Sequence, residues 1–424
     1  MPQPSRHASS AVEPLEGLVR AGFERRLDKV SRAPIALALS GGGDSIALLH
    51  FAAAWAAEHG RPLLALTVDH GLNCDSAVWT GEAGEAARAV GAAWRALAWT
   101  GPKPASGLPA AARAARHRLL ADAAREAGAS VLLTGHTGDD LLEGDLIRAE
   151  TPQLGRMSDW DPSPAWPEGR RVFLCRPLLG LRRANLRAWL HTRAISWLDD
   201  PANEDERYAR ARARLRLSSS PVPTGEGEHA DAWWRRHGAA LAPPTAGGGP
   251  LPPLRRGRQN GLIDLPRSAD ARTLSAALLC AAGTTTPPRG EALHNLLARL
   301  QAGEDFTATL VGARLVAEAE TVLIGRDPGR QGLPTVHTAP GQRLVWDGRF
   351  ELVAEAGAVV PLAGRLAQLS PQDRAEIAVL PAWARPTVPA YVHLDGRVAL
   401  ARGTPLGPVR LRAALGQIGH ESDI

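Results

Sequence analysis

The sequence has little cysteine and no long apolar run, and both absences narrow what the protein can be. Its three cysteines, Cys74, Cys175 and Cys280, are odd in number and far apart. They exclude a disulfide framework, a zinc site of paired cysteines and a C-x-x-C redox pair. No apolar run approaches the roughly 18 residues that a membrane span needs, and the first residues lack a secretory leader. We therefore expect a cytoplasmic protein that does not associate with a membrane.

Lysine is also scarce in this chain. Only Lys29 and Lys103 are lysines among 49 basic residues, so arginine carries nearly all of the positive charge, and the net charge is +5. The planar guanidinium group suits contacts with phosphates and bases, but an excess spread over a whole chain also arises from a biased genome composition. Only local clusters of arginine therefore indicate nucleic-acid binding.

The first half of the chain alternates regularly between strand-like and helix-like segments. Apolar runs at 34–39, 63–68, 92–98 and 131–134 each precede a helix-periodic segment, at 45–57, 76–90, 109–127 and 139–149. A further strand-like run at 172–179 leads to a helical segment at 182–194. This alternation predicts βαβ units around a doubly wound parallel sheet, which is an α/β fold.

The second half has a different composition. Ser, Pro and Gly clusters at 218–260 indicate a linker, a helical stretch follows near 270–300, and apolar segments suggest a hairpin at 308–326. Beyond Gly329, short apolar pieces are interrupted by Pro and Gly, which predicts a β-rich module. Since 424 residues exceed one ordinary core, we predict a first domain over 1–217, a small α+β middle domain over 218–330 and a β-rich domain over 331–424.

The turn between the first predicted strand and helix reads Ser40-Gly41-Gly42-Gly43-Asp44-Ser45. Backbone N–H groups and the helix dipole favour an anion at such a turn, and glycines let the backbone approach a phosphate. Asp44 would repel a bare phosphate, which predicts a bridging Mg²⁺. The turn lacks the last glycine of a dinucleotide fingerprint and the GK[ST] of a P-loop. The alternative is a glycine-rich turn that binds no ligand.

Polar residues also follow the second and fourth predicted strands, in Thr67-Val68-Asp69-His70-Gly71-Leu72 and in Gly135-His136-Thr137-Gly138-Asp139-Asp140-Leu141-Leu142-Glu143. Carboxyl ends of parallel strands share one edge of a sheet, so His70, His136 and the acids are expected to converge near the glycine turn. Arg113 and Arg116 share a helical face by their i, i+3 spacing. The alternatives are ordinary loop or core histidines, a helix N-cap made of the acids, and a solvated arginine face.

These motifs together resemble a known family. Ser40 to Ser45 matches the SGGxDS motif of the PP-loop, or N-type, ATP pyrophosphatases. VDHGL, the arginine pair and GH-x-x-DD-x-x-E occur in the order found in the tRNA(Ile)-lysidine synthases. Further elements are similar to the RPLL, DPSN, Y-x-RN-x-IR and last-domain sequences of that family, and they lie at 176–179, 200–203, 208–214 and 344–352. The resemblance is strongest over 35–215.

The resemblance implies an enzyme that adenylates the wobble cytidine of a CAU-anticodon tRNA(Ile) with ATP and Mg²⁺, and then joins free L-lysine to C2 of that base. It implies ATP binding by Ser40, Gly41, Gly42, Gly43, Asp44, Ser45, Asp69, His70 and Gly135, with Mg²⁺ on Asp44. It implies catalytic roles for Asp44, Arg113, His136 and Asp139, and lysine binding by Asp139, Asp140 and Glu143. The middle and last domains would bind tRNA. A homodimer is one possible assembly.

An arginine cluster supplies the expected tRNA contact. Arg207, Arg210, Arg212, Arg214 and Arg216 lie within ten residues of a predicted helix, and with Arg116 the first four are assigned to tRNA. The alternative is a solvated helix whose arginines pair with nearby acids.

The chain departs from the family pattern at His117, Gly144, Ala149 to Gly155 and Ala211. These departures concern the substrate loop and part of the tRNA contact, not the ATP turn. Three other functions would each have a requirement of their own. A tRNA thiolase usually needs paired cysteines, a small-molecule amide ligase would need a glutaminase site, and a catalytically impaired tRNA-binding relative would not need an intact SGGGDS.

Overall fold

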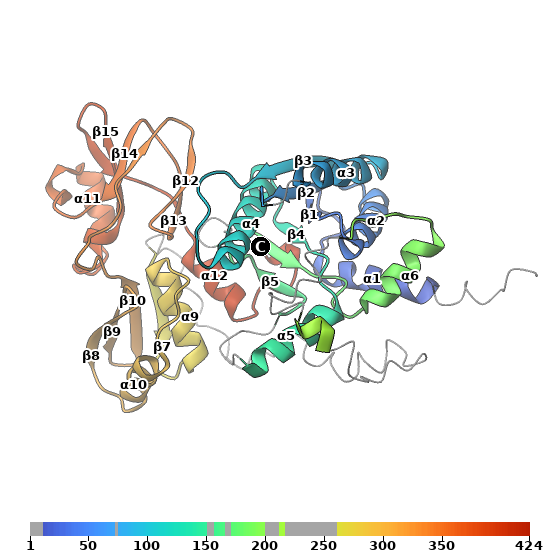
Figure 1. The fold of residues 1–424 in the computed structure, drawn as a ribbon. Helices are drawn as coiled ribbons and strands as arrows, with labels where there is room; N and C mark the ends of the chain where they lie inside the picture. The colour runs from blue at the N-terminus through green and yellow to red at the C-terminus, as the bar shows by residue number, and fades with distance from the viewer. Residues whose placement is uncertain (1–11, 73–74, 151–156, 166–170, 200–211, 217–260) are drawn as a thin grey trace, which may run out of the picture. The chain divides into compact units, whose positions relative to one another are not determined.

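A computed structural model describes residues 12–72, 75–150, 157–165, 171–199, 212–216 and 261–424 (Figure 1). The chain divides into two compact units. Unit 1 comprises Met1–Ala165, Arg171–Thr245 and Ile418–Ile424, and unit 2 comprises Trp166–Arg170 and Ala246–Gln417. The predicted linker at 218–260 lies outside the described residues, and the domain boundaries at 217 and 330 stay predictions.

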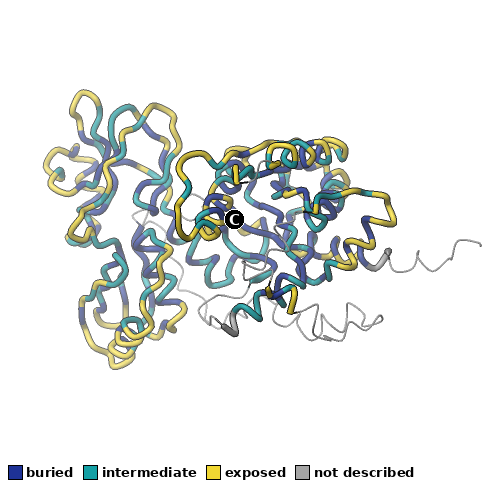
Figure 2. Tube along the Cα trace, in the orientation of Figure 1, coloured by how far each residue is buried: buried dark blue, intermediate teal, exposed yellow. Residues whose placement is uncertain are grey.

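Unit 1 is built on a six-stranded sheet of order β3-β2-β1-β4-β6-β5. Five strands are parallel: β1 (Ile35–Ala38), β2 (Leu63–Asp69), β3 (Ala93–Ala98), β4 (Val131–Leu133) and β6 (Phe173–Cys175). β5 (Trp160–Pro162) is antiparallel to β6. The central strands β1 and β4 are mostly buried, whereas the edge strand β3 is largely exposed (Figure 2). The predicted doubly wound parallel sheet is confirmed.

Helices cover this sheet, and all of them except the first, which was not predicted, follow the predicted segments. They are α1 (Val12–Arg26), α2 (Gly43–Glu58), α3 (Ser76–Ala89), α4 (Leu108–Glu126), α5 (Gly138–Glu150) and α6 (Arg183–Thr192). Side chains that alternate along the strands, such as Ala36, Leu66 and Leu132, pack with Leu120 and Ala124 of α4. Elsewhere α2 packs against α1 and α6 through aromatic pairs, Trp55 with Phe23 and Phe51 with Trp189.

The strand predicted at 172–179 is shorter than expected. It ends at Cys175, and Leu179 N–H then donates to the Arg176 carbonyl, which turns the chain away from the sheet. Pro177 lacks the N–H that a continued strand would need. This turn delivers the chain to the first residue of α6, Arg183.

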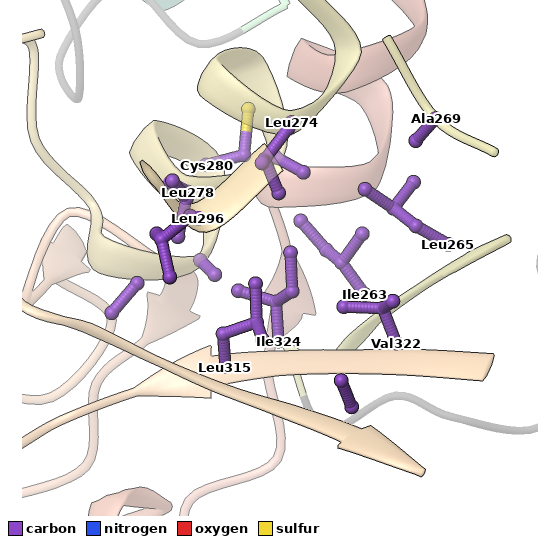
Figure 3. Close-up of a cluster of buried hydrophobic side chains, with 14 of the residues drawn as sticks. Ile263, Leu265, Ala269, Leu274, Leu278, Cys280, Leu296, Leu315, Val322 and Ile324 are labelled. Carbon is purple, nitrogen blue, oxygen red and sulfur yellow. The ribbon is translucent and has the colours of Figure 1, made fainter. Parts of the chain in front are cut away.

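The first half of unit 2 is an antiparallel sheet of order β7-β10-β9-β8 with helices packed on it. Its elements are β7 (Ile263–Pro266), α9 (Ala271–Ala282), α10 (Gly290–Gln301), β8 (Phe306–Leu310), β9 (Ala313–Glu318) and β10 (Thr321–Arg326). Ile263, Leu315 and Ile324 of the strands meet Leu274 of α9 and Leu296 of α10 in one core (Figure 3).

The hairpin predicted at 308–326 was wrong in its strand count. The apolar run at 308–318 is two strands, because Val311 and Gly312 turn the chain with positive φ angles of 48° and 81°. A turn of only two residues does not interrupt the apolar pattern of the sequence, so the pattern gave no sign of it. The segment therefore contributes three strands instead of two.

The rest of unit 2 is rich in β structure, as predicted. β11 (Val336–Thr338), β14 (Gly357–Pro361), β15 (Pro389–His393) and β16 (Val398–Leu400) form one sheet, and β12 (Arg343–Trp346), β13 (Phe350–Val353) and β17 (Thr404–Pro405) form another. The remaining elements are α11 (Pro371–Ala378), α12 (Gly407–Ala414) and the 3₁₀ turns Leu366–Gln368 and Arg385–Thr387. α12 packs on α9.

The last described segment, Ile418–Ile424, belongs to unit 1 and ends in the 3₁₀ turn Glu421–Asp423. Glu421 forms a two-point ion pair with Arg61, with both N–O distances at 2.7 Å. Their side chains are 5% and 0% exposed. Within the described residues, no helix is long and apolar enough to cross a membrane.

Candidate active site

The site lies where the order of strands in the sheet reverses. β1 is flanked by β2 and β4, so the connection after β1 and the connection after β4 leave in opposite directions along one edge. The glycine turn follows β1 and the GHTGDD segment follows β4. A Cβ atom added at Gly135 would lie 3.1 Å from the Asp44 carbonyl carbon, so glycine lets these two loops meet backbone to backbone without a shift of either loop.

The glycine turn is organised by its own hydroxyl groups. Ser45 Oγ donates to the Gly42 carbonyl at 2.9 Å, and it accepts from the backbone N–H of Ser40 at 3.2 Å. The Ser40 hydroxyl lies 3.1 Å from the same oxygen. Gly41 has a φ of 86°, which favours glycine. The turn thus presents the amino terminus of α2, with Asp44 in its first turn.

A segment that sequence reasoning missed braces this turn. Leu198 N–H donates to the Gly41 carbonyl at 3.0 Å, and Leu198 forms a parallel bridge with Gly42. The Trp197 ring lies 3.4 Å from the position that a Cβ of Gly43 would take. The available signal was the family-like element just beyond, at 200–203, which lies outside the described residues.

Arginines from the start of α6 hold the predicted acids together. Arg183 Nε donates to Asp44 Oδ2 at 2.9 Å, and its Nη1 donates to Glu143 Oε1 at 3.2 Å. Its Nη2 lies 3.6 Å from Asp140 Oδ2. Sequence reasoning missed Arg183, although two arginines at a helix amino terminus, where acids are favoured, were a visible signal.

Asp139 and Asp140 are engaged more fully than Glu143. Arg182 donates to Asp139 Oδ1 at 3.0 Å, and the backbone N–H of Arg183 donates to Asp139 Oδ2 at 2.7 Å. Asp140 accepts from the N–H and the hydroxyl of Thr137 at 2.8 and 3.0 Å, so it caps α5, as the alternative interpretation anticipated. Both acids therefore fix the conformation of the loop after β4 by hydrogen bonds, in addition to giving it negative charge.

Two buried carboxylate oxygens in this cluster lack a hydrogen-bond donor among the described residues, Asp44 Oδ1 and Glu143 Oε2. The Glu143 side chain is only 1% exposed. Burial raises the pKa of Asp44, Arg183 opposes that shift, and Asp140 and Asp139 add to it. A buried acceptor without a donor costs free energy. The two oxygens therefore suit a cation, and Asp44 fits Mg²⁺, which commonly uses one or two carboxylates plus phosphate oxygens.

A second polar cluster lies at the carboxyl end of β2. Asp69 accepts from the N–H of Gly71 at 2.8 Å, and Arg116 Nε lies 3.2 Å from His70 Nε2. His70 contacts the edge of Trp99, and the Lys103 ammonium lies 3.9 Å from the Trp99 ring centroid. Burial lowers the pKa of His70, and Arg116 lowers it further. The structure joins two predicted residues here, His70 and Arg116, with an aromatic and a lysine that were not predicted.

The remaining predicted residues are placed as follows. His136 Nδ1 lies 3.0 Å from the Thr134 hydroxyl, and Arg113 is exposed on α4, one turn before Arg116. Arg214 Nε donates to Glu143 Oε1 at 2.7 Å, so this predicted tRNA contact also joins the carboxylate cluster. Arg212 is exposed on the same short helical segment. Arg207 and Arg210 lie outside the described residues.

Comparison with known proteins points to one family over most of the chain. Residues 18–220 match the family model of the PP-loop domain. The chain is 46% identical to the tRNA(Ile)-lysidine synthase of Caulobacter vibrioides, with 95% of this chain and 98% of that protein covered. It is 34% identical to the enzyme of that name from Hyphomonas neptunium, covering 80% and 96%. It is 36% identical to that of Brucella anthropi, covering 79% and 75%.

Proposed function

The chain belongs to the tRNA(Ile)-lysidine synthase family, and from this premise we propose how its site works. It is an ATP-using ligase that forms a carbon–nitrogen bond in tRNA(Ile). The reaction we assign has two steps. The C2 carbonyl oxygen of the wobble cytidine attacks the α-phosphorus of ATP, and pyrophosphate leaves. The ε-amine of free L-lysine then attacks C2, and AMP leaves.

The observation that supports this assignment most strongly is the pairing of two different sites at one sheet edge. A glycine turn and the amino terminus of α2 suit a pyrophosphate. Beside them, Glu143 keeps one buried oxygen without a donor among the described residues, and that oxygen suits an ammonium group. Nucleotide and amine would thus meet at one place, which is what an adenylation followed by amine attack requires.

The roles that we propose follow from these placements. The backbone of Gly41, Gly42 and Gly43 with the hydroxyls of Ser40 and Ser45 would hold the phosphates, and Asp44 would hold Mg²⁺, which would neutralise the leaving pyrophosphate. Glu143 would bind and help deprotonate the lysine ammonium, positioned by Asp139 and Asp140. Arg113 would stabilise charge on the α-phosphate, and His136 would orient the base or a phosphate. Asp69, His70 and Gly135 would line the nucleotide side.

The tRNA contacts remain part of this proposal. Arg116, Arg207, Arg210, Arg212 and Arg214 would contact phosphates of the anticodon stem and loop. Arg116 is supported by its position beside His70 at the carboxyl end of β2. A homodimer is a further proposal, tested by the mass of the free protein in solution.

The alternative of a thiolase is not favoured by the described cysteines. Burial raises the pKa of both Cys175 and Cys280 to about 12, so neither supplies a thiolate near neutral pH. Cys74 lies outside the described residues. The two described thiols also belong to different units.

The direct test of the function is labelling of tRNA. Purified protein with ATP, Mg²⁺ and labelled lysine should label a tRNA(Ile) transcript that carries a CAU anticodon. A transcript with U in place of the wobble C should stay unlabelled, as should a reaction with labelled glutamine. Equal labelling of the two transcripts would overturn the assignment.

The role of Asp44 has its own test. Asp44→Asn should abolish pyrophosphate release, since it removes a charge assigned to Mg²⁺ that is worth several kcal/mol. Binding of tRNA should stay within about threefold, because Asp44 is assigned to the metal and not to RNA. Near-normal pyrophosphate release by this variant would show that the glycine turn has been misinterpreted.

A further inference from the structure

We propose that Arg183 is a positioning residue that presents one oxygen of Asp44 to the nucleotide side and one oxygen of Glu143 to the amine side. This inference rests on the proposed function. One guanidinium group bonds both carboxylates: Nε takes Asp44 Oδ2 and Nη1 takes Glu143 Oε1. The other oxygen of each carboxylate is the one without a donor among the described residues. Arg183 therefore selects the oxygen that Asp44 offers to a ligand, and together with Arg214, whose Nε donates to the same Glu143 Oε1 at 2.7 Å, it selects the oxygen that Glu143 offers.

The position of Arg183 in the helix supports a role outside the helix itself. It is the first residue of α6, and no acidic residue lies in the first turn. A cation at a helix amino terminus opposes the helix dipole. The arginine must therefore gain its stability from the acids that it contacts, and Asp44, Asp140 and Glu143 raise its pKa against the effect of burial.

The backbone fixes where this side chain begins. The N–H of Arg183 donates to Asp139 at 2.7 Å, and the N–H of Gly138 donates to the Leu181 carbonyl at 2.7 Å. The start of α6 is thus joined to the start of α5, which carries Glu143 one turn later. At 20% exposure, the Arg183 side chain is held between two acids that follow different strands.

The bridging geometry makes a specific requirement of the residue. A planar guanidinium group can donate from Nε and Nη1 in two fixed directions, whereas an ammonium group is a single point of charge. Lysine at this position could approach one acid or the other. It could not keep both contacts. Arg183→Lys should therefore affect the nucleotide half-site, which is formed by Asp44, and the amine half-site, which is formed by Glu143, to different extents.

The experiment measures the two half-sites separately. Equilibrium dialysis would give the affinity of each variant for Mg²⁺ with a non-hydrolysable ATP analogue and, separately, for labelled lysine. Arg183→Ala should weaken both by about tenfold or more, the loss expected for charge-assisted hydrogen bonds. Arg183→Lys should restore one affinity and not the other. Arg187→Ala is the matched control, since this arginine of the same helix pairs with the exposed Asp199 and should change neither.

Thermal unfolding of each variant separates a folding defect from a site defect, and Arg183→Lys retains the charge if Arg183→Ala fails to fold. The inference is overturned if Arg183→Ala weakens only one affinity, or if Arg183→Lys restores both. Failure of the proposed function would look different, because wild-type protein would then neither bind lysine nor label tRNA.

Discussion

Two arginine–carboxylate clusters of unit 1, around Arg61 and around Arg183, differ in how completely they are satisfied. Arg61 makes five hydrogen bonds, to the carbonyls of Ala33 and Asp28 and to both oxygens of Glu421. Glu421 also accepts from the backbone N–H of Asp28 at 2.9 Å. We call this group the anchor cluster.

The cluster around Arg183 contains the same residue types in the same unit, and yet Asp44 and Glu143 each keep a buried oxygen without a donor among the described residues. Its arginine is 20% exposed, against 0% for Arg61. When all carboxylate oxygens of a cluster accept hydrogen bonds from the protein, none remains to bind a ligand. We call such a cluster closed, and we call a cluster open when a carboxylate oxygen lacks a donor and can bind a ligand. We propose that the unsatisfied carboxylate oxygens, and not the presence of buried charge, distinguish a binding site from a structural pair.

The largest effect is expected at the anchor cluster. Glu421→Ala should lower the free energy of unfolding by about 3–5 kcal/mol, because it leaves the Arg61 charge buried without its partner. Chemical denaturation with circular dichroism measures this change. Glu126→Ala is the matched control, since the Arg95–Glu126 pair is half exposed on both sides and should lose about 1 kcal/mol or less. Equal losses in the two variants would remove the distinction between the clusters.

The same kind of substitution at the open cluster should act on activity instead. Glu143→Gln keeps the shape of the side chain and an oxygen that can still accept from Arg183 and Arg214. The free energy of unfolding should therefore change by about 1 kcal/mol or less. The value of kcat/KM for lysine should fall by about a hundredfold, since the charge offered to the ammonium is lost. A large loss of stability with an unchanged kcat/KM would show that Glu143 has a structural role, like Glu421 in the anchor cluster.

His117 sharpens the comparison, because its buried Nδ1 also lacks a partner among the described residues but carries no charge when neutral. Burial, with Arg113, Arg116 and Arg176, lowers its pKa to about 4 from an ordinary 6.5. The unfolded chain therefore binds the proton first. As pH falls from about 6.5 to 4, the protein should lose stability, by about 2 kcal/mol between pH 7 and pH 4.5.

His117→Phe should remove that loss while lysine transfer near pH 7 stays within about twofold, because no charge at this position serves the reaction. Unfolding measured across the pH range tests it, with His337→Gln, an exposed histidine of unit 2, as the control. A loss of activity in His117→Phe would mean that an unpartnered atom marks the site even without charge.

The smallest effect is expected from Arg212, an exposed arginine that is assigned to tRNA. Arg212→Ala should weaken tRNA binding slightly and flatten the slope of log K against log salt by roughly one unit, as expected for one lost phosphate contact. Affinity for ATP should stay constant. Arg95→Ala, an exposed arginine on the edge strand β3, serves as the control. An unchanged slope would mean that Arg212 makes no phosphate contact with the tRNA.

Local patterns predicted much of unit 1 and less of unit 2. The four strand–helix pairs and the turn from Ser40 to Ser45 were predicted because each depends on neighbouring residues: an apolar run, glycines and a helix start. The prediction at 308–326 missed a strand, since a turn at Val311 and Gly312 interrupts the apolar run without polar residues. The prediction that the acids after β4 lie near the glycine turn was correct, because the carboxyl ends of parallel strands meet at one edge of the sheet.

The glycine turn, the order of motifs and the α/β fold class could be inferred from the chain alone, because their physical causes lie within a few residues. The pairing of arginines with acids could not. Arg183 contacts Asp44 from 139 positions away, and Arg61 contacts Glu421 from 360 positions away. In a chain whose basic residues are almost all arginine, no local signal tells which acid each of these two arginines contacts. Only the packing of helix ends at the edge of the sheet, and the return of Ile418–Ile424 to unit 1, decides which charges meet and which oxygens stay open.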